Sequence, residues 1–561
     1  MRIEKIKLKN FRSFGDETEI ILNPKLNVIL GENGSGKSNL FIALKKLALF
    51  AENRGNYYPI DESEQKPLFI KSDWYLEKTD EEILIEITLK IDDFLVEDLI
   101  PKLMENHEEE DALSPLLKEC LGNELIISFK NTHGSNLRLP LIKWGPLYFY
   151  NNYLSNSPSN FDPGSNEIIE LNNFLNKLLN KLLKFGAIDL PVIFSQYNRP
   201  LVSLKGHEFY DDILKIFYEN FKLFEDIRHK SENNEIRVKE SLDGRYLAAL
   251  LLGLKNNPEK RIRERFGEIQ KKFKEYLPGL NLEITKSHDY VDIRIYSDGG
   301  GLEHSIDQSG TGIIEFVIFL SNLIGLEGKI FVFEEPELHL HPSAQRALSK
   351  LIKECSTKNQ VFVLTHSPPF FDNENLGNNM RVKYNNFNSK IIKPNLLVFD
   401  SEEIYKLNKE LSRQNKEIFF SRAVLLVEGQ TELGAMPIFA KKVGENFDIN
   451  NIYICPVDGK SSFPIYQKIL EEFKIPYFIL CDKDALSEGT VNSYSNKIVL
   501  DSNFEVFLNN KGFSQLFREA RGKVGNSKPR KGTYVAERID KDDIPKEIKE
   551  TIEKVIDLSK P

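Results

Sequence analysis

The sequence is poor in cysteine and contains no apolar run long enough to cross a membrane. Its four cysteines are scattered and include no CxxC pair; they are Cys120, Cys355, Cys455 and Cys481. This pattern argues against a structural zinc site and against a disulfide framework. No secretory signal is expected either. We therefore predict a protein of the reducing cytoplasm with no membrane contact.

Positive charge is not in excess. The 561 residues include 75 Lys and Arg against 84 Asp and Glu, a formal net charge of −9. The whole chain is therefore not a basic coat for nucleic acid, and any such binding must come from local patches. Hydrophobic residues make up 41% and charged residues 28%, which is typical of globular proteins. At this length we expect two or three domains.

A phosphate-binding loop is indicated near the N-terminus. The segment GENGSGKS at 31–38 matches GxxxxGK[ST] at every required position. It follows the strand-like EIILNPKLNVIL and precedes the helical pattern NLFIALKKLALF. Backbone amides of such a loop cradle phosphates, the lysine reaches the β- and γ-phosphates, and the serine coordinates Mg²⁺. We therefore predict an ATP site formed by Gly31, Asn33, Gly34, Gly36, Lys37 and Ser38.

The matching acidic strand comes much later, as KIFVFEEPELHLHP at 329–342. Four apolar residues lead into two glutamates. We expect Glu334 to hold the nucleotide's Mg²⁺ and its water, and Glu335 to polarise the attacking water.

Two further segments fit the same site. The apolar strand Val361–Leu364 leads to His366, which could sense a γ-phosphate. The small-residue loop DQSGTG at 307–312 precedes a helix, and Ser309 and Gly310 could offer amides to a phosphate.

Carboxylates follow two apolar strands in the C-terminal third, in LLVEGQTE at 425–432 and ILCDKDAL at 479–486. Ends of parallel strands gather at one sheet edge, the usual ligand site of an open α/β fold. Hard oxygen donors there attract Mg²⁺ or Mn²⁺, and two such ions can clamp a phosphodiester. A later segment, KIVLDSNFEVFL, adds two more acids. The predicted metal ligands are Glu428, Glu432, Asp482, Asp484, Asp501 and Glu505.

A basic stretch follows at 511–531. It holds seven Lys and Arg against one acid, Glu519; the seven are Lys511, Arg518, Arg521, Lys523, Lys528, Arg530 and Lys531. It is either a solvated face or a phosphate-binding strip beside the acidic cluster, and we favour the strip.

The order phosphate loop, small-residue loop, acidic strand, switch histidine resembles an ABC-type ATPase head of the SMC/RecF kind. Glu334 stands where the family has aspartate, and QSGTG only loosely resembles the LSGGQ signature. The Q-loop glutamine has only Asp73 or Gln196 as candidates. His339 and His341 could suggest zinc, but we interpret them as D-loop residues at a head dimer contact.

The two acidic motifs resemble the Toprim domain shared by topoisomerases, primases and a group of nucleases. Glu432, four positions after Glu428, is more similar to the nuclease branch. The alternative is that these are ordinary surface acids at strand ends.

We predict an α/β chain: an ABC-type ATPase head with a helical insertion, followed by a C-terminal Toprim domain. The boundaries are 1–158 for the first half of the head, 159–240 for the insertion, 241–400 for the second half and 401–561 for the Toprim domain. The leucine stripe of the insertion is either internal core or a dimer contact, and we predict dimerisation there. We expect the Asn-rich stretch 372–390 to be irregular and a helix near 402–420.

This arrangement resembles the overcoming-lysogenization-defect (OLD) family of endonucleases, which includes the nuclease subunit of the Gabija anti-phage system. The resemblance implies homodimers that use two metals to cut DNA, in many cases in bacterial or phage defence. We expect a homodimer or higher homo-oligomer, and as a possible partner a helicase-like or other defence-system protein. The resemblance also implies a lysine that stabilises the cleavage transition state, which would be Lys531 or Lys528.

Two other functions fit the same motifs. One is an ATP-dependent sensor or scaffold of a defence complex whose Toprim fold has lost catalysis, although the acids are intact at all expected positions. The other is an ATPase-gated nuclease that cuts RNA such as tRNA, since a Toprim metal site does not exclude RNA.

Overall fold

The computed structural model describes residues 1–52, 71–78, 81–103, 118, 121–131, 138–144, 147–149, 206–224, 247–286, 291–299, 303–413, 415–487 and 496–560. These residues form two compact units. The first unit comprises Met1–Asn27 and Ser38–Leu364, and the second comprises Val28–Lys37 and Thr365–Pro561.

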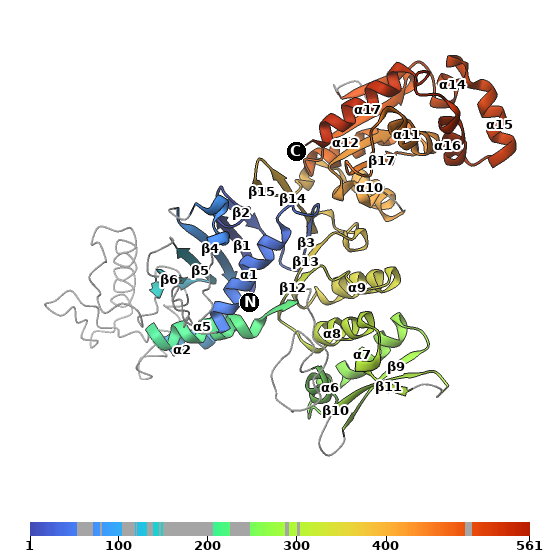
Figure 1. Cartoon of the computed structure of the whole chain (residues 1–561). Helices are drawn as coiled ribbons and strands as arrows, with labels where there is room; N and C mark the ends of the chain where they lie inside the picture. The colour runs from blue at the N-terminus through green and yellow to red at the C-terminus, as the bar shows by residue number, and fades with distance from the viewer. Residues whose placement is uncertain are drawn as a thin grey trace. The chain divides into compact units, whose positions relative to one another are not determined.

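An antiparallel sheet opens the first unit (Figure 1). Its strand order is β2-β1-β4-β5-β6-β7, with bounds β1 Arg2–Lys9, β2 Thr18–Ile21, β4 Ile83–Lys90, β5 Glu124–Asn131, β6 Arg138–Trp144 and β7 Leu147–Phe149. Apolar and polar residues alternate along the strands, which buries Ile6, Leu8, Ile85 and Ile87 on one face. The strands predicted near 83–93 and 124–130 are confirmed.

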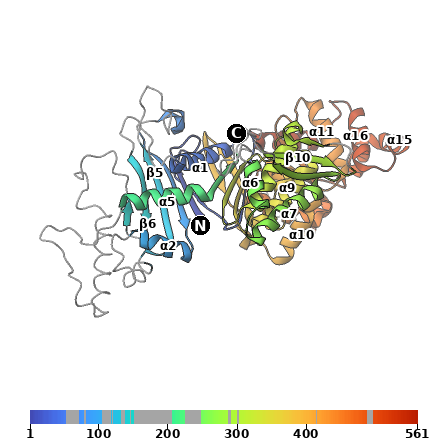
Figure 2. The same cartoon turned by 90° about the horizontal axis from the view of Figure 1, so that it is seen from below.

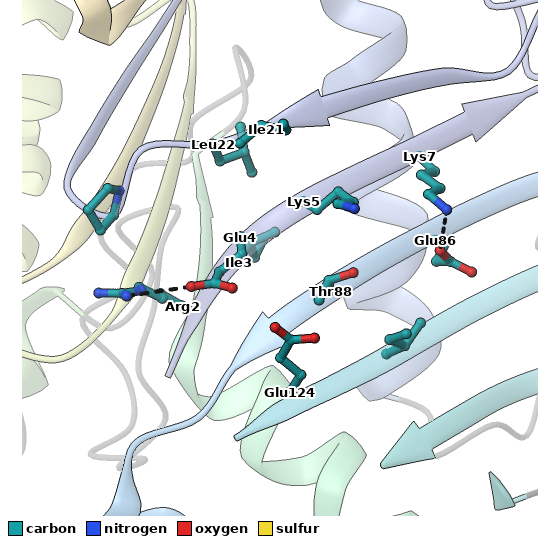
Figure 3. Close-up of a pocket in the computed structure, with 12 residues that line it drawn as sticks. Arg2, Ile3, Glu4, Lys5, Lys7, Ile21, Leu22, Glu86, Thr88 and Glu124 are labelled. Carbon is teal, nitrogen blue, oxygen red and sulfur yellow. Dashed lines mark hydrogen bonds and ion pairs between the residues drawn. The ribbon is translucent and has the colours of Figure 1, made fainter. Parts of the chain in front are cut away.

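The other face of this sheet is polar. A hollow of about 440 Å³ lies there, and Figure 3 shows ion pairs among the side chains that line it. Lys7 lies 3.5 Å from Glu86, and Arg2 lies 3.5 Å from Glu4 on its own strand. Cations and acids balance one another in this hollow, as on a solvated sheet face.

Helices α1 (Lys37–Glu52), α2 (Asp93–Leu103) and α5 (Gly206–Asn220) accompany this sheet. Phe50 of α1 meets Phe129 of β5 edge to face, with ring centroids 4.8 Å apart. Figure 2 shows α5 beside the sheet, where it contacts β7.

A parallel set of strands carries the acidic motif of the first unit. Strand β12 (Ile330–Glu334) pairs with β13 (Gln360–Thr365) on one side and with β8 (Phe221–Phe224) on the other. Helices α8 (Thr311–Gly325) and α9 (Pro342–Cys355) flank it in sequence. The aromatic rings of Phe224 and Phe333 stack 4.5 Å apart, so these strands form a dry core.

Of the predicted insertion 159–240, only 206–224 lies within the described residues. That part is helical up to Asn220 and then becomes β8 instead of continuing as a helix. The apolar spacing had suggested a helix throughout, but Phe221 and Phe224 are buried in strand pairing with β12. The boundaries of the insertion stay a prediction.

A small antiparallel sheet completes the first unit. It has the order β11-β10-β9, with bounds β9 Leu280–Lys286, β10 Val291–Ser297 and β11 Glu303–Ser305. Helices α6 (Leu247–Lys255) and α7 (Lys260–Tyr276) pack on it, grouped with it in Figure 2.

The second unit begins with the strand that leads into the phosphate loop, β3 (Leu26–Leu30). It pairs in parallel with β14 (Asn379–Asn385), which forms a hairpin with β15 (Asn388–Ile392). The prediction of an irregular stretch at 372–390 is therefore wrong. Asparagines conceal the strand in the sequence, although Met380 and Val382 are buried as in any core strand.

The C-terminal sheet is fully parallel, with the order β17-β16-β18-β19. Its bounds are β16 Ala423–Val427, β17 Ile452–Pro456, β18 Tyr477–Asp482 and β19 Lys497–Leu500. The predicted parallel strands are confirmed. The surrounding helices are α10 Ser401–Arg413, α11 Gln430–Val443, α12 Phe463–Glu472, α13 Lys483–Ser487, α14 Phe504–Leu508, α15 Ser514–Val524, α16 Lys528–Arg538 and α17 Lys546–Ser559.

Helix α17 closes one face of this sheet (Figure 1). It is charged in composition, but one stripe is fully buried: Ile548, Ile552, Val555 and Ile556. The stripe joins a single apolar core with residues of β16, α11 and α16. The C-terminal helix is therefore an integral part of the Toprim-like layer structure.

Candidate functional site

The phosphate loop adopts backbone conformations that favour glycine. Gly31, Gly34 and Gly36 all have positive φ, and α1 begins at Lys37. The lysine side chain is only 4% exposed. Its Nζ donates to the carbonyl oxygens of Gly31 at 2.8 Å and Glu32 at 2.9 Å, so the cation is held above its own loop.

His366 meets this lysine. Nδ1 of His366 lies 3.2 Å from Nζ of Lys37. Burial and then the charge of Lys37 lower the pKa of His366 to about 4, and a backbone hydrogen bond partly opposes this shift. At neutral pH an uncharged imidazole therefore faces the Lys37 ammonium.

The hairpin of β14 and β15 supports the loop from outside. Ser389 Oγ donates to the carbonyl of Ser35 at 2.7 Å. A Cβ on Gly31 would lie 2.8 Å from the carbonyl oxygen of Val382, closer than Cβ atoms are found. The loop can pack this closely only because residue 31 is glycine.

Arg381, on β14, is 3% exposed and lies beside the same loop. Its guanidinium donates to the backbone carbonyls of Ser421 at 3.0 Å and Lys474 at 3.2 Å. Burial lowers its pKa to about 10, and the carboxylate of Glu32, 3.9 Å away, opposes that shift. No feature of the sequence had pointed to Arg381.

The acidic strand of the first unit ends as predicted. Glu334 is the last residue of β12, and both Glu334 and Glu335 are partly exposed. Glu335 has a φ of 45°, an uncommon value for a non-glycine residue, and its N–H donates to Leu364 at 2.8 Å. Such local strain is typical of a residue held in place for chemistry.

The small-residue loop also starts a helix. Gly310 is the N-cap of α8, and Ser309 Oγ lies 3.0 Å from Nε2 of His304. The N–H of Ser309 donates to the carbonyl of Ile306 at 2.9 Å, and that of Ile313 donates to the carbonyl of Gly310 at 2.9 Å.

The two histidines of the ELHLHP motif have separate local roles. His339 Nδ1 lies 3.0 Å from the buried carboxylate of Glu315, on α8. His341 is the N-cap of α9 and accepts from the N–H of Ser343. Among the described residues they join no metal-binding group.

Asp73 is a structural residue in this fold. It is fully buried and lies 2.8 Å from both Arg12 and Lys46. Two cations therefore already satisfy its carboxylate. Gln196, the other Q-loop candidate, lies outside the described residues.

The Toprim acids meet at the carboxyl edge of the parallel sheet. Glu428 follows β16, and Asp482 ends β18, its neighbour in the sheet. The pKa of Glu428 is raised to about 7, by burial first and then by the neighbouring carboxyl of Asp482. Backbone N–H groups of Asp484 and Ala485 donate to Oδ1 of Asp482 at 3.1 and 3.2 Å.

Glu432 and Glu505 extend this cluster. Glu432, in the first turn of α11, is 8% exposed, and burial raises its pKa to about 7. Glu505, in the first turn of α14, accepts from Thr431 Oγ1 at 3.0 Å and lies 3.6 Å from Nζ of Lys531. Lys528 acts on Glu432 through its charge.

The remaining two predicted ligands are less closely placed. Asp484 is exposed in the first turn of α13, and Asp501 is exposed just after β19. Within the described residues no three acid, His or Cys side chains form a closed cation site. The acids instead stand in pairs along one edge.

A pocket of about 550 Å³ lies over this edge. Its lining includes Glu428, Glu432, Glu505 and Lys528, and also Asp458 and Asn503, which sequence reasoning had missed. Asp458 follows β17 and accepts from Gln430 Nε2 at 3.2 Å. The signal that could have found it is the DGK turn after a third parallel strand.

The basic stretch 511–531 covers α15 and the start of α16. Six of its seven cations are exposed, and Lys531 is partly buried. Lys511 is paired with Glu547 at 2.9 Å, whereas Arg518, Arg521, Lys523 and Arg530 extend from the surface of the same two helices. A cationic face thus adjoins the acidic pocket that Lys528 lines.

Two families match this chain. Residues 1–371 match the family described as "AAA ATPase domain", and residues 419–484 match "Overcoming lysogenization defect protein-like, TOPRIM domain". The predicted α/β combination of an ATPase head and a Toprim domain is therefore confirmed. These domains use a nucleotide and a divalent cation, which confirms the cofactor classes.

Several known proteins are similar. Endonuclease GajA of Bacillus cereus is 25% identical over 87% of this chain and 76% of its own length. The Old nuclease of Escherichia phage P2 is 34% identical over 28% of each chain. An uncharacterized protein of Methanocaldococcus jannaschii is 28% identical over 42% of this chain, but the match spans only 29% of that protein. The crystallised SMC head bound to ScpA has 16% identity and a TM-score of 0.39, covering 71% of this chain and 99% of that one.

Helices of transmembrane length and hydropathy are lacking in the described ranges.

Proposed function

We propose, from the premise that this chain belongs to the OLD family of proteins that join an ATPase domain to a Toprim domain, that it is an ATP-dependent DNA endonuclease. The observation that carries the proposal is the placement of Glu428 and Asp482 at the ends of neighbouring parallel strands, where the carboxyl of Asp482 acts on that of Glu428. Two neighbouring, partly buried carboxylates repel each other, and such pairs are expected where a cation is to be bound.

The acids fit a divalent metal. Burial raises the pKa of both Glu428 and Glu432 to about 7, and a cation between such carboxylates would relieve their repulsion. We propose Mg²⁺ or Mn²⁺, two ions in this site and one with ATP. When bound, such ions polarise the phosphodiester and activate water. The proposed ligands are Glu428, Glu432, Asp482, Glu505, and also Asp484 and Asp501.

The lysines of α16 would serve the phosphate. Lys531, 3.6 Å from Glu505, would stabilise negative charge on a phosphate bound at the proposed metal site. Lys528 lines the pocket and remains the second candidate for this role. The cations of α15 would hold the DNA backbone on either side, since phosphate contacts fix orientation without reading sequence.

The ATPase residues take the roles that their placement supports. Lys37 and the loop amides would hold the phosphates, while Ser38 and Glu334 would hold the nucleotide's metal. Glu335 would polarise the attacking water, and His366 would contact the γ-phosphate. Ser309 and Gly310 would meet the nucleotide of a second copy, because ABC-type heads close on ATP as dimers.

The relatives extend the proposal to context. GajA and the Old nuclease are named as nucleases, and we infer that this chain cuts phage or plasmid DNA in the cytoplasm as part of antiviral defence. We further expect a homodimer or a higher oligomer, with a helicase-like protein as partner.

The test is nuclease activity of the purified protein on supercoiled plasmid, linear duplex and tRNA, with and without Mg²⁺ or Mn²⁺. We expect metal-dependent nicking of the plasmid. Preferential cutting of tRNA would show that the substrate is RNA and not DNA. No cutting of any substrate by a protein that still binds ATP would support a sensor or scaffold instead.

A further inference from the structure

Two glycines far apart in the sequence let helices α11 and α16 cross in direct backbone contact. Gly434 lies on α11 and Gly532 on α16. A Cβ on Gly434 would lie less than 3.0 Å from the carbonyl oxygen of Pro529, and a Cβ on Gly532 less than 3.0 Å from that of Thr431. Each glycine thus receives a carbonyl of the opposite helix.

Neither glycine is required by its backbone conformation, because both lie inside regular helices without a positive φ. Close approach is the remaining reason for glycine at these positions. Thr533 strengthens the contact, since its Oγ1 donates to the carbonyl of Gly434 at 3.1 Å. Farther along, Lys442 of α11 donates to the carbonyls of Glu537 and Ile539 at the end of α16.

The crossing lies beside the acidic pocket. Thr431, whose carbonyl faces Gly532, uses its hydroxyl to hold Glu505 at 3.0 Å. Lys531, the neighbour of Gly532, lies 3.6 Å from the same Glu505 oxygen. One helix of the crossing therefore supplies Glu432, the other supplies Lys531, and Glu505 stands between them.

We infer that Gly434 and Gly532 are positioning residues of the Toprim site: their backbone contact fixes Lys531 relative to Glu432 and Glu505. This inference rests on the proposed nuclease function. A methyl group at either glycine must push the helices apart, and a misplacement of about 1 Å at a catalytic group can cost on the order of 100-fold in rate.

The test is Gly532→Ala in the full-length protein. We expect kcat for plasmid nicking to fall by roughly 10- to 100-fold while KM for DNA and ATP binding change by less than about twofold. The matched control is Gly267→Ala on α7 in the first unit, where a Cβ would meet nothing within 4 Å. That variant should behave as wild type, because the same substitution there moves no helix.

A double-mutant cycle separates positioning from general loss of stability. If Gly532 acts through Lys531, Gly532→Ala should change kcat by less than roughly twofold in a Lys531→Ala background. Full multiplication of the two losses would overturn the inference. A general loss of folding would also lower ATP binding, which the inference does not expect.

A crystal structure of Gly532→Ala tests the predicted displacement of Lys531 without a cleavage assay. We expect the distance between Lys531 Nζ and Glu505 Oε1 to lengthen from its present 3.6 Å. An unchanged distance would overturn the inference, whether or not the protein cuts nucleic acid. A protein that cuts no nucleic acid would contradict only the proposed function.

Discussion

Glu32 of the phosphate loop forms an ion pair with Arg422, with 2.7 Å between Oε2 and Nε. Arg422 directly precedes β16, the strand that Glu428 follows. That acid lies six residue steps beyond Arg422, a span of about 20 Å in extended chain. The loop proposed to bind ATP and the strand that carries the first Toprim acid therefore share one charged contact.

This contact predicts a route for coupling. Lys37 holds the carbonyl of Glu32, so nucleotide binding that draws Lys37 to the phosphates also releases part of the loop. We expect Arg422→Gln to bind ATP normally but to lose most of the dependence of its nicking rate on ATP. The measurement is nicking rate against ATP concentration for wild type and variant.

The matched control is Lys274→Gln, which removes an exposed ion pair of similar length, 2.8 Å to Asp298, in the first unit. Exposed pairs contribute little stability, about 0–1 kcal/mol, so neither variant should unfold. An ATP response in Arg422→Gln equal to that of the control would rule out this route.

Asp482→Ala should reduce metal-dependent nicking by at least roughly 100-fold, because loss of one ligand removes the geometry that an in-line displacement needs. Isothermal titration with Mn²⁺ should show weaker binding in parallel. The control is Asp542→Ala, an exposed acid of the same domain. Wild-type nicking by Asp482→Ala would move the active site elsewhere.

Glu335→Gln should bind ATP yet hydrolyse it roughly 100- to 10,000-fold more slowly, the usual worth of a general base. The side chain keeps its shape but loses the charge that polarises water. Phosphate release and nucleotide binding are measured side by side. If ATP then shifts nicking by this variant away from the nucleotide-free rate, binding alone is enough to couple the sites; hydrolysis at the wild-type rate would contradict the assigned role.

His366 should stay neutral well below pH 6.5 in the nucleotide-free protein, since burial and Lys37 lower its pKa to about 4. The unfolded chain then binds the extra proton first, so this residue makes stability fall as pH drops from about 6.5 toward 4. NMR titration of the imidazole, assigned with His366→Gln, measures the midpoint. Lys37→Ala should raise that midpoint, and a midpoint near 6.5 in the wild type would contradict the buried contact.

Ile552→Ala should lower the free energy of unfolding of the second unit by about 2–5 kcal/mol, because the side chain is fully buried under the parallel sheet. Denaturant unfolding monitored with and without ATP measures the loss. Glu553→Ala, the exposed neighbour on the same helix, should change it by less than about 0.5 kcal/mol. Equal, small effects would mean that α17 is not part of the core.

The sequence was sufficient to predict the local motifs. The phosphate loop, the acidic strand and the two Toprim strands each combine an apolar run with chemistry at its end, so strand and site could be predicted together. Glu428 and Asp482 meet for that reason: parallel neighbours bring their ends to one edge.

Contacts between distant segments could not be predicted in this way. Arg381 looks like an ordinary surface residue in an Asn-rich stretch, yet it is buried against carbonyls 40 and 93 positions away. Nothing in the sequence marks Thr431, inside the first acidic motif, or Gly532 as functional. Their role becomes visible only in the helix crossing. The hairpin at 379–392 was missed for the same reason, since its partner strand β3 lies near the N-terminus, far from it in sequence.

The buried guanidinium of Arg381 also bears on how such domains are exchanged in evolution. It supplies hydrogen bonds to the carbonyls of Ser421 and Lys474, although it lies before the start of the Toprim strands. A nuclease domain grafted onto another ATPase at residue 401 would leave this donor behind and carry two unsatisfied carbonyls with it, at a cost of about 1–3 kcal/mol each. A nuclease domain that is transferred with these hydrogen bonds intact must therefore begin no later than β14.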